Sequence, residues 1–123
     1  MMKRLIAAFV AAFCLSAAPA SAQEADVVDV EATQTGEGNW RFSVTVSSPD
    51  TGWDSYADEW QVVGPDGTVL GTRTLHHPHE NEQPFTRSLS GVEIPDDVDE
   101  VTVRARMNDG GYGGEEMTVP LGR

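Results

Sequence analysis

The sequence predicts an all-β protein, a sandwich of seven antiparallel strands in one domain. Beyond residue 26, hydrophobic residues recur at every second position in several short runs, which is the period of a strand with one buried face. Clusters of Gly, Pro, Asn and Asp separate these runs at intervals of about eight to twelve residues, as in sandwich folds. In the same region no run carries a hydrophobic stripe at helical spacing over a useful length.

The first two predicted strands form a hairpin. In residues 40–47 (WRFSVTVS) an aromatic residue or valine at every even position alternates with Arg, Ser or Thr, which is the clearest half-buried strand of the chain. The strand before it covers residues 27–33. Its expected inward positions are Val28, Val30 and Ala32. The segment TGEGN between the two strands has the composition of a hairpin loop.

The third and fourth predicted strands form a second hairpin. Trp60 and Val62 alternate within the third strand and precede the sequence Gly-Pro-Asp-Gly at residues 64–67. Proline presets φ for a turn and glycine supplies a positive φ at its exit. Residues 68–75 are therefore expected to return as the partner strand.

The last three predicted strands follow a histidine-rich stretch. Residues 85–89 form a short strand, and GVEIP (residues 91–95) brings the chain to a corner. Residues 101–107 (VTVRARM) alternate again between hydrophobic and polar side chains. The turn NDGGYGG (residues 108–114) then leads to a final strand over residues 117–121.

The segment SLSGVEIPDDVDEVTVRARMNDGGYGG (residues 88–114) resembles the E–F–G region of fibronectin type III and similar immunoglobulin-like domains. In those domains a proline-containing corner precedes an alternating strand rich in valine and arginine, and a glycine-rich hairpin follows. Val101 stands nearest to the position of the family's corner tyrosine. The wider block from Trp53 to Phe85 resembles small secreted bacterial proteins of no assigned activity. The resemblance implies a seven-stranded immunoglobulin-like sandwich located outside the cytoplasm.

The N-terminus is predicted to be a cleaved signal peptide spanning residues 1–22. A Lys-Arg pair precedes the apolar run LIAAFVAAFCL, and Ala20-Ser21-Ala22 then supplies a cleavage site of small residues. The apolar run is about half as long as a membrane span requires, so we expect no membrane-embedded anchor. Cys14 follows the bulky Phe13, which argues against lipidation. We therefore expect a periplasmic or secreted domain of residues 23–123.

The chain that remains after cleavage is strongly acidic. All 20 Asp and Glu lie after residue 22, whereas two of the eight basic residues precede it, so cleavage changes the net charge from −12 to −14. Such a surface repels phosphate backbones and attracts cations or basic partners, which excludes nucleic acid as a ligand. The single cysteine is also removed, so no disulfide is expected in the domain.

The sequence LHHPHENEQPF (residues 75–85), here called the histidine loop, contains all three histidines. On an extended segment residues two apart share a face, so the second and third histidines would project together and the first away from them. Imidazole nitrogens and nearby carboxylates suit Cu(II) or Zn(II). The candidate metal ligands are His76, His77, His79, Glu80 and Glu82. The other interpretation is a solvated crossover loop, because a structural zinc site requires four ligands and no cysteine is available.

A second group of candidates consists of aromatic side chains outside the alternating runs. Trp53 and Tyr56 precede the third strand, and exposed aromatic rings can anchor a protein or stack on a sugar. The competing interpretation, which we prefer, is that both rings cap the open end of the sandwich, since large aromatic residues usually bury. Tyr112 in the glycine-rich turn is a further candidate for ligand binding.

Arg87 is also a binding candidate, although its position favours a structural role. It alternates in phase with Phe85 and Leu89 and is therefore expected to face the core. A guanidinium group at such a position must be paired or must extend its charged head to water. The candidate carboxylate partners are Asp54, Asp58 and Glu82.

No catalytic pattern occurs in the sequence. After cleavage no thiol remains, and neither G-x-S-x-G nor H-E-x-x-H is present. We therefore expect a non-enzymatic module that binds a protein partner through the aromatic residues and the histidine loop. One alternative is a copper or zinc chaperone that uses HHPHE, with that metal as its cofactor. Another is a carbohydrate-binding accessory domain that uses the aromatic residues.

Overall fold

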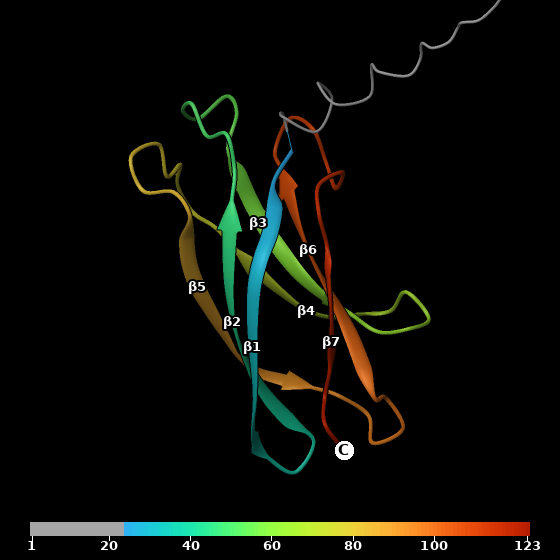
Figure 1. The fold of residues 1–123 in the computed structure, drawn as a ribbon. Helices are drawn as coiled ribbons and strands as arrows, with labels where there is room; N and C mark the ends of the chain where they lie inside the picture. The colour runs from blue at the N-terminus through green and yellow to red at the C-terminus, as the bar shows by residue number, and fades with distance from the viewer. Residues whose placement is uncertain (1–23) are drawn as a thin grey trace, which may run out of the picture.

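Residues 24–123 are described by the computed structural model shown in Figure 1. They form seven strands, which are β1 (Asp26–Gly36), β2 (Asn39–Ser47), β3 (Ala57–Val63), β4 (Val69–Thr74), β5 (Phe85–Glu93), β6 (Glu100–Met107) and β7 (Met117–Pro120). One sheet has the order β1-β2-β5 and the other the order β4-β3-β6-β7, and all neighbouring strands are antiparallel. The predicted all-β fold with two antiparallel sheets is confirmed.

The N-terminal predictions concern a different part of the chain. The signal peptide expected at residues 1–22, its cleavage site and Cys14 lie outside the described residues. Within residues 24–123 no helix is long and apolar enough to cross a membrane.

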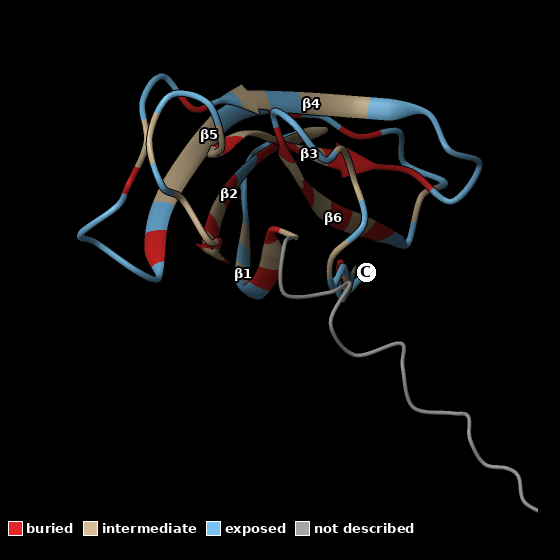
Figure 2. Ribbon diagram, turned by 90° about the horizontal axis from the view of Figure 1, so that it is seen from above, coloured by how far each residue is buried: buried red, intermediate tan, exposed pale blue. Residues whose placement is uncertain are grey.

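The hydrophobic core lies between the two sheets and is filled by alternate residues of the central strands. Phe42 and Val44 of β2 and Trp60 of β3 have no exposed surface, and Trp40 is 4% exposed. Figure 2 shows the same alternation along β6 as buried bands separated by less buried ones. The strand period predicted for residues 40–47 and 101–107 is thus confirmed.

Strand β1 departs from the predicted phase at its start. The sequence alternation places Val28 toward the core, but Val28 is 45% exposed and Val27 is buried instead. The pairing with β2 shifts register between Val27 and Asp29. Such a bulge adds one residue to the strand. The alternation of inward and outward side chains before the bulge is therefore out of phase with the alternation after it. Val30 and Ala32, beyond the bulge, pack against the core as predicted.

Strand β5 is longer than the predicted strand over residues 85–89. It continues to Glu93 through Gly91, whose φ of 71° is readily adopted only by glycine. The pairing with β2 shifts register here. Val92 lies opposite Trp40 and Leu89 lies opposite Phe42, so three steps along β5 correspond to two steps along β2. The predicted corner therefore begins only after β5 ends.

Three connecting segments gather at one end of the sandwich, at the top of Figure 1. They are residues 48–56 between β2 and β3, the histidine loop between β4 and β5, and residues 108–116 between β6 and β7. We call these three segments the upper loop end. The β1–β2 hairpin and the connection from β5 to β6 lie at the opposite end. The upper loop end holds most of the candidate site residues.

Candidate functional site

The histidine loop is fixed to residues 48–57 by the buried carboxylate of Asp50. The Asp50 side chain has no exposed surface. Its Oδ1 accepts hydrogen bonds from the hydroxyl of Ser48 at 2.7 Å and from the backbone N–H of Ala57 at 3.0 Å. Its Oδ2 accepts one from the backbone N–H of His79 at 2.8 Å. A buried carboxylate requires such donors, because burial without them is costly.

Gln83 makes a second connection between the same two segments. Its Oε1 accepts a hydrogen bond from the backbone N–H of Ser48 at 2.9 Å. Its Nε2 donates to the carbonyl of His79 at 2.9 Å and to the Ser48 hydroxyl at 3.2 Å. The loop is therefore held at both its middle and its end. Neither Asp50 nor Gln83 stands out in the sequence, and only their contacts distinguish them from the other polar residues of the loops.

The ring of His79 belongs to the interior of this end. His79 is 5% exposed, and its ring stacks on Phe85 with centroids 3.9 Å apart and an interplanar angle of 8°. Its Nε2 lies 3.0 Å from Nη2 of Arg87. Because a guanidinium only donates, Nε2 must accept, and the proton of the neutral ring is on Nδ1. Nδ1 lies 4.0 Å from the Asp50 carboxylate and has no hydrogen-bond partner.

The other candidate metal ligands lie around His79 with unequal exposure. The rings of His77 and His79 are 4.6 Å apart, so the two histidines expected to project together do so. His76, Glu80 and Glu82 are exposed. Among residues 24–123 no three side chains of the metal-ligating types converge into one group. Copper or zinc binding by this loop therefore stays a prediction from the sequence.

Burial makes His79 sensitive to acid. Burial, and then the positive charge of Arg87, lower the pKa of His79 below its ordinary value of 6.5. The unfolded chain therefore takes up a proton at a higher pH than the native state. Stability from the neutral ring is present above the ordinary pKa and is lost as the pH falls below it.

We predict that the free energy of unfolding is lower at about pH 5.5 than at about pH 7.5. Urea unfolding at both values measures this difference. The His79→Gln variant should show a smaller difference than the wild type, because its side chain cannot be protonated. The His76→Gln variant is the control and should keep the wild-type difference, because His76 is exposed. An unchanged pH dependence in His79→Gln would show that another group is responsible.

Trp53 projects from the upper loop end into solvent. Its exposed fraction is 66%, and its ring meets Tyr56 edge to face at 5.7 Å. The expectation that Trp53 caps the sandwich is therefore wrong. A cap requires the ring to lie over the core and to be shielded from solvent, which an exposure of 66% excludes.

The position of Trp53 is nevertheless defined by hydrogen bonds to the neighbouring loop. The side-chain amide of Asn108 donates to the carbonyl of Trp53 at 3.1 Å and accepts from the backbone N–H of Tyr56 at 2.9 Å. The backbone N–H of Asn108 donates to the carbonyl of Tyr56, also at 2.9 Å. Residues 51–55 close a turn of their own, in which the backbone N–H of Thr51 donates to the carbonyl of Ser55 at 3.0 Å and that of Ser55 donates to the carbonyl of Gly52 at 3.1 Å. The support of the aromatic pair by Asn108 could not be predicted, because it joins residues more than 50 positions apart in the sequence.

Tyr112 lies apart from Trp53, against the four-stranded sheet. Its hydroxyl donates to the carboxylate of Glu59, and the guanidinium of Arg104 lies 4.3 Å from the centre of its ring. Burial and this hydrogen bond raise the pKa of Tyr112. Its hydroxyl and its ring thus both contact side chains of the same chain. Tyr112 was predicted as a ligand contact, and the structure places it in an internal cluster of side chains.

Arg87 has the inward position expected from the strand phase. It lies opposite the buried Val44 in the pairing of β5 with β2, and directly opposed residues share a face. Of its three candidate carboxylate partners, Glu82 is the one in contact, at 3.5 Å. Asp58 pairs instead with Arg106 at 2.6 Å.

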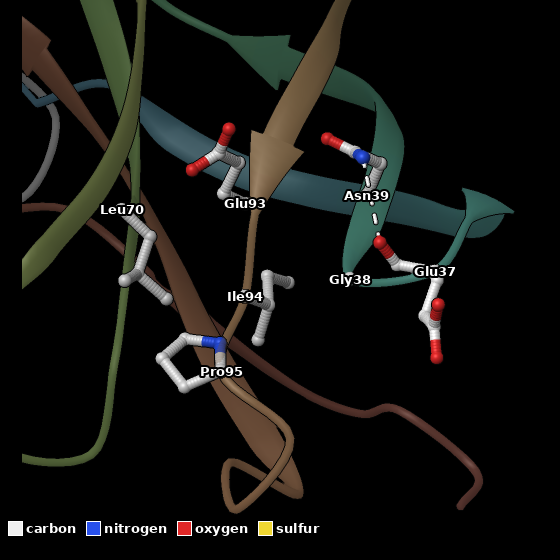
Figure 3. A pocket seen from close by; sticks show the side chains of 7 residues that line it. All are labelled: Glu37, Gly38, Asn39, Leu70, Glu93, Ile94 and Pro95. Carbon is white, nitrogen blue, oxygen red and sulfur yellow. Dashed lines mark hydrogen bonds between the residues drawn. The ribbon is translucent and has the colours of Figure 1, made fainter.

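Two hollows lie at the opposite end of the sandwich. The first is an open hollow of about 430 Å³, and Figure 3 shows Leu70, Ile94, Pro95, Glu37 and Glu93 among the side chains that line it. The second encloses about 530 Å³ and shares Leu70 and Pro95 with the first. Both combine an apolar floor with acidic side chains, so they favour uncharged or cationic groups over anions.

Comparisons with known proteins identify a similar protein but assign no fold. No family model matches the chain, and no solved structure matches it. The chain is 44% identical over 97 residues to a protein of Halomicrobium mukohataei named "Putative lipoprotein". The matched region covers 79% of this chain and 47% of the relative, so the chain spans about half of that protein's length.

Proposed function

We propose that this chain is a non-enzymatic binding module that acts outside the cytoplasm and recognises a protein partner through the upper loop end. The observation that carries the proposal is the exposure of Trp53, at 66%, on a loop whose backbone is held by Asn108. Large aromatic residues are usually buried, so an exposed tryptophan on a backbone held by a neighbouring loop is a candidate contact residue. A tryptophan held in this way offers a large contact area at a small cost in conformational entropy.

The proposal extends to the fold family. We infer an immunoglobulin-like, fibronectin type III-like topology from the order of the seven strands. In the immunoglobulin constant arrangement the fourth strand joins the first, second and fifth. Here β4 pairs with β3, while the remaining strands are distributed as in that arrangement. Sandwiches of this class commonly bind ligands with the loops at one end, which agrees with a site at the upper loop end.

The proposed location rests on the N-terminal sequence and on the relative. Residues 1–22 have the charge pattern, apolar run and small-residue site of a signal peptide. The name of the Halomicrobium mukohataei relative describes a lipoprotein, a class of envelope-associated protein. Both observations support export of this chain to the periplasm or the medium.

A metal-binding function is the alternative with a specific observation in its favour. The rings of His77 and His79 lie 4.6 Å apart, and imidazole is a natural ligand of copper and zinc. Against it, Nε2 of His79 already accepts a hydrogen bond from Arg87, and a metal ion bound there would lie next to a guanidinium cation. The protein-binding proposal has no such conflict.

Trp53→Ala should weaken partner binding by about thirtyfold or more, which is the usual effect of removing a central aromatic contact. The measurement is capture of partners from a periplasmic or culture-medium extract on immobilised protein, followed by affinity determination for the captured protein. Val69→Ala is the matched control, because Val69 is also hydrophobic and 44% exposed but lies on β4 away from the upper loop end. Equal binding by the wild type and Trp53→Ala would contradict the proposal. Retention of a glycan instead of a protein, with loss in Trp53→Ala, would favour the carbohydrate-binding alternative.

A further inference from the structure

A small pocket beside the histidine loop gathers positive charge on an otherwise acidic domain. It encloses about 80 Å³ and is lined by Arg73, Thr74, Leu75, His76, His77, His79 and Arg87. Residues 23–123 contain six arginines, and two of them line this pocket together with all three histidines. Neither the metal hypothesis nor the Trp53 surface accounts for this concentration of basic side chains.

The two arginines enter the pocket from different sheets. Arg73 lies opposite Trp60 in the pairing of β4 with β3, and Arg87 lies opposite Val44 in the pairing of β5 with β2. Trp60 and Val44 are fully buried, so both arginines start from the inner faces of their sheets. Strands β4 and β5 are in close contact at this edge, since a Cβ at Gly71 would lie 3.0 Å from the side chain of Leu89.

The four other arginines of the domain have defined partners. Arg106 pairs with Asp58, and Arg104 donates to Gln61 at 2.8 Å. Arg123 donates to the carbonyls of the β5–β6 connection, and Arg41 to Ser88 at 3.0 Å.

The two pocket arginines, in contrast, have hydrogen-bond partners only within eight positions of them in the sequence. Nη1 of Arg73 donates to the carbonyl of Thr74, but its Nε is buried without a hydrogen-bond partner. Arg87 donates to His79 and to a carbonyl, and its carboxylate contact is Glu82 at 3.5 Å, whose side chain is 60% exposed. Two guanidinium groups that share a pocket repel each other unless an anion lies between them.

We infer that this pocket is a binding site for a small oxyanion of the size of phosphate or sulfate, held by the guanidinium groups of Arg73 and Arg87. Guanidinium presents a planar fork of N–H donors that matches the oxygens of such anions. The pocket volume of about 80 Å³ suits a group of this size. Repulsion from distant acidic residues is screened over about 10 Å at moderate salt, so the contacts within the pocket decide binding. The site adds a second ligand class to the proposed binding function and does not depend on Trp53.

Titration with sodium phosphate tests this inference, with sodium chloride added to keep the ionic strength constant because a domain of net charge −14 responds to salt itself. The wild type should show a saturable rise in melting temperature with phosphate. Arg73→Gln and Arg87→Gln should each weaken the apparent affinity about tenfold or more. Arg41→Gln should respond like the wild type, because Arg41 is exposed and outside the pocket. Trp53→Ala should also keep the response, so that failure of the partner-binding proposal and failure of this one are separable.

NMR on the wild type keeps the test decisive if an arginine variant does not fold. Phosphate should shift the side-chain Nε–H signal of Arg73 and leave that of Arg104 in place. No difference between phosphate and chloride, or an unmoved Arg73 signal, would overturn the inference. So would saturable binding of Zn(II) or Cu(II) to the loop together with no effect of phosphate, since that result assigns the pocket to a cation.

Discussion

Replacing Trp60 with alanine should lower the free energy of unfolding by about 3–5 kcal/mol or prevent folding. Trp60 has no exposed surface and lies at the centre of the core, on the strand that pairs with both β4 and β6. Its truncation removes a large apolar area and leaves a cavity between the sheets, and the two effects add. A domain of this size has a total stability of about 5–15 kcal/mol, so the loss is a large part of it. Urea denaturation followed by circular dichroism measures the change.

The other two tryptophans make this experiment a test of the core as a whole. Trp40→Ala should be similarly destabilising because Trp40 is 4% exposed, whereas Trp53→Ala should have an effect below about 1 kcal/mol because that ring is 66% exposed. Equal shifts of the urea midpoint for the three variants would contradict the placement of the inner and outer faces. A selective loss in the two buried variants supports it.

Asp50→Ala should destabilise the domain by about 3–5 kcal/mol, which is the second large effect we expect. The substitution leaves three buried donors without an acceptor, namely the hydroxyl of Ser48 and the backbone N–H groups of Ala57 and His79. Each unsatisfied buried donor costs about 1–3 kcal/mol. Because one of these donors belongs to the histidine loop, hydrogen exchange of the His79 amide should also become faster.

Asp54→Ala serves as the control for Asp50→Ala. Asp54 lies in the same connection between β2 and β3, but it is exposed, so its removal should change stability by no more than about 0.5 kcal/mol. If both variants unfold at the same urea concentration, Asp50 does not anchor the histidine loop. The stability of Asp50→Asn should fall between that of the wild type and that of Asp50→Ala. The amide keeps one acceptor oxygen, but it replaces the other oxygen with an NH₂ group, which donates and therefore faces another donor.

The strands were predictable because each carries its own local pattern. The alternation in β2 and β6 identifies the buried face without any knowledge of the partner strands. The irregularities were not predictable in this way. The bulge at Val27 and Asp29 and the continuation of β5 through Gly91 depend on pairing with β2, which no local pattern specifies.

The candidate site was predictable in part for the same reason. The proximity of His77 and His79 follows from their spacing of two residues, and it is present in the structure. The roles of Asp50 and Arg73 were missed, because each depends on groups from distant parts of the chain. Asp50 binds a backbone group 29 residues away, and Arg73 and Arg87 line one pocket only because β4 and β5 lie at one edge of the sandwich.

The exposure of Trp53 also could not be predicted from the sequence. General statistics favour burial for a tryptophan, and only the tertiary position of the loop decides otherwise. The sequence pattern nevertheless separated Trp53 from Trp40 and Trp60, since it alone stands outside an alternating run. Its position outside such a run is what makes Trp53 a candidate contact residue from the sequence alone.

Photo-crosslinking in the native cells tests the proposed binding surface most directly. A photoreactive phenylalanine analogue placed at Trp53 should form a covalent adduct with a specific protein, because this position is the expected centre of the contact surface. The same analogue at Val69, which is also exposed but lies on β4, should form no such adduct. Absence of an adduct at position 53, or the same adducts from both positions, would contradict the assignment of the upper loop end as the partner-binding site.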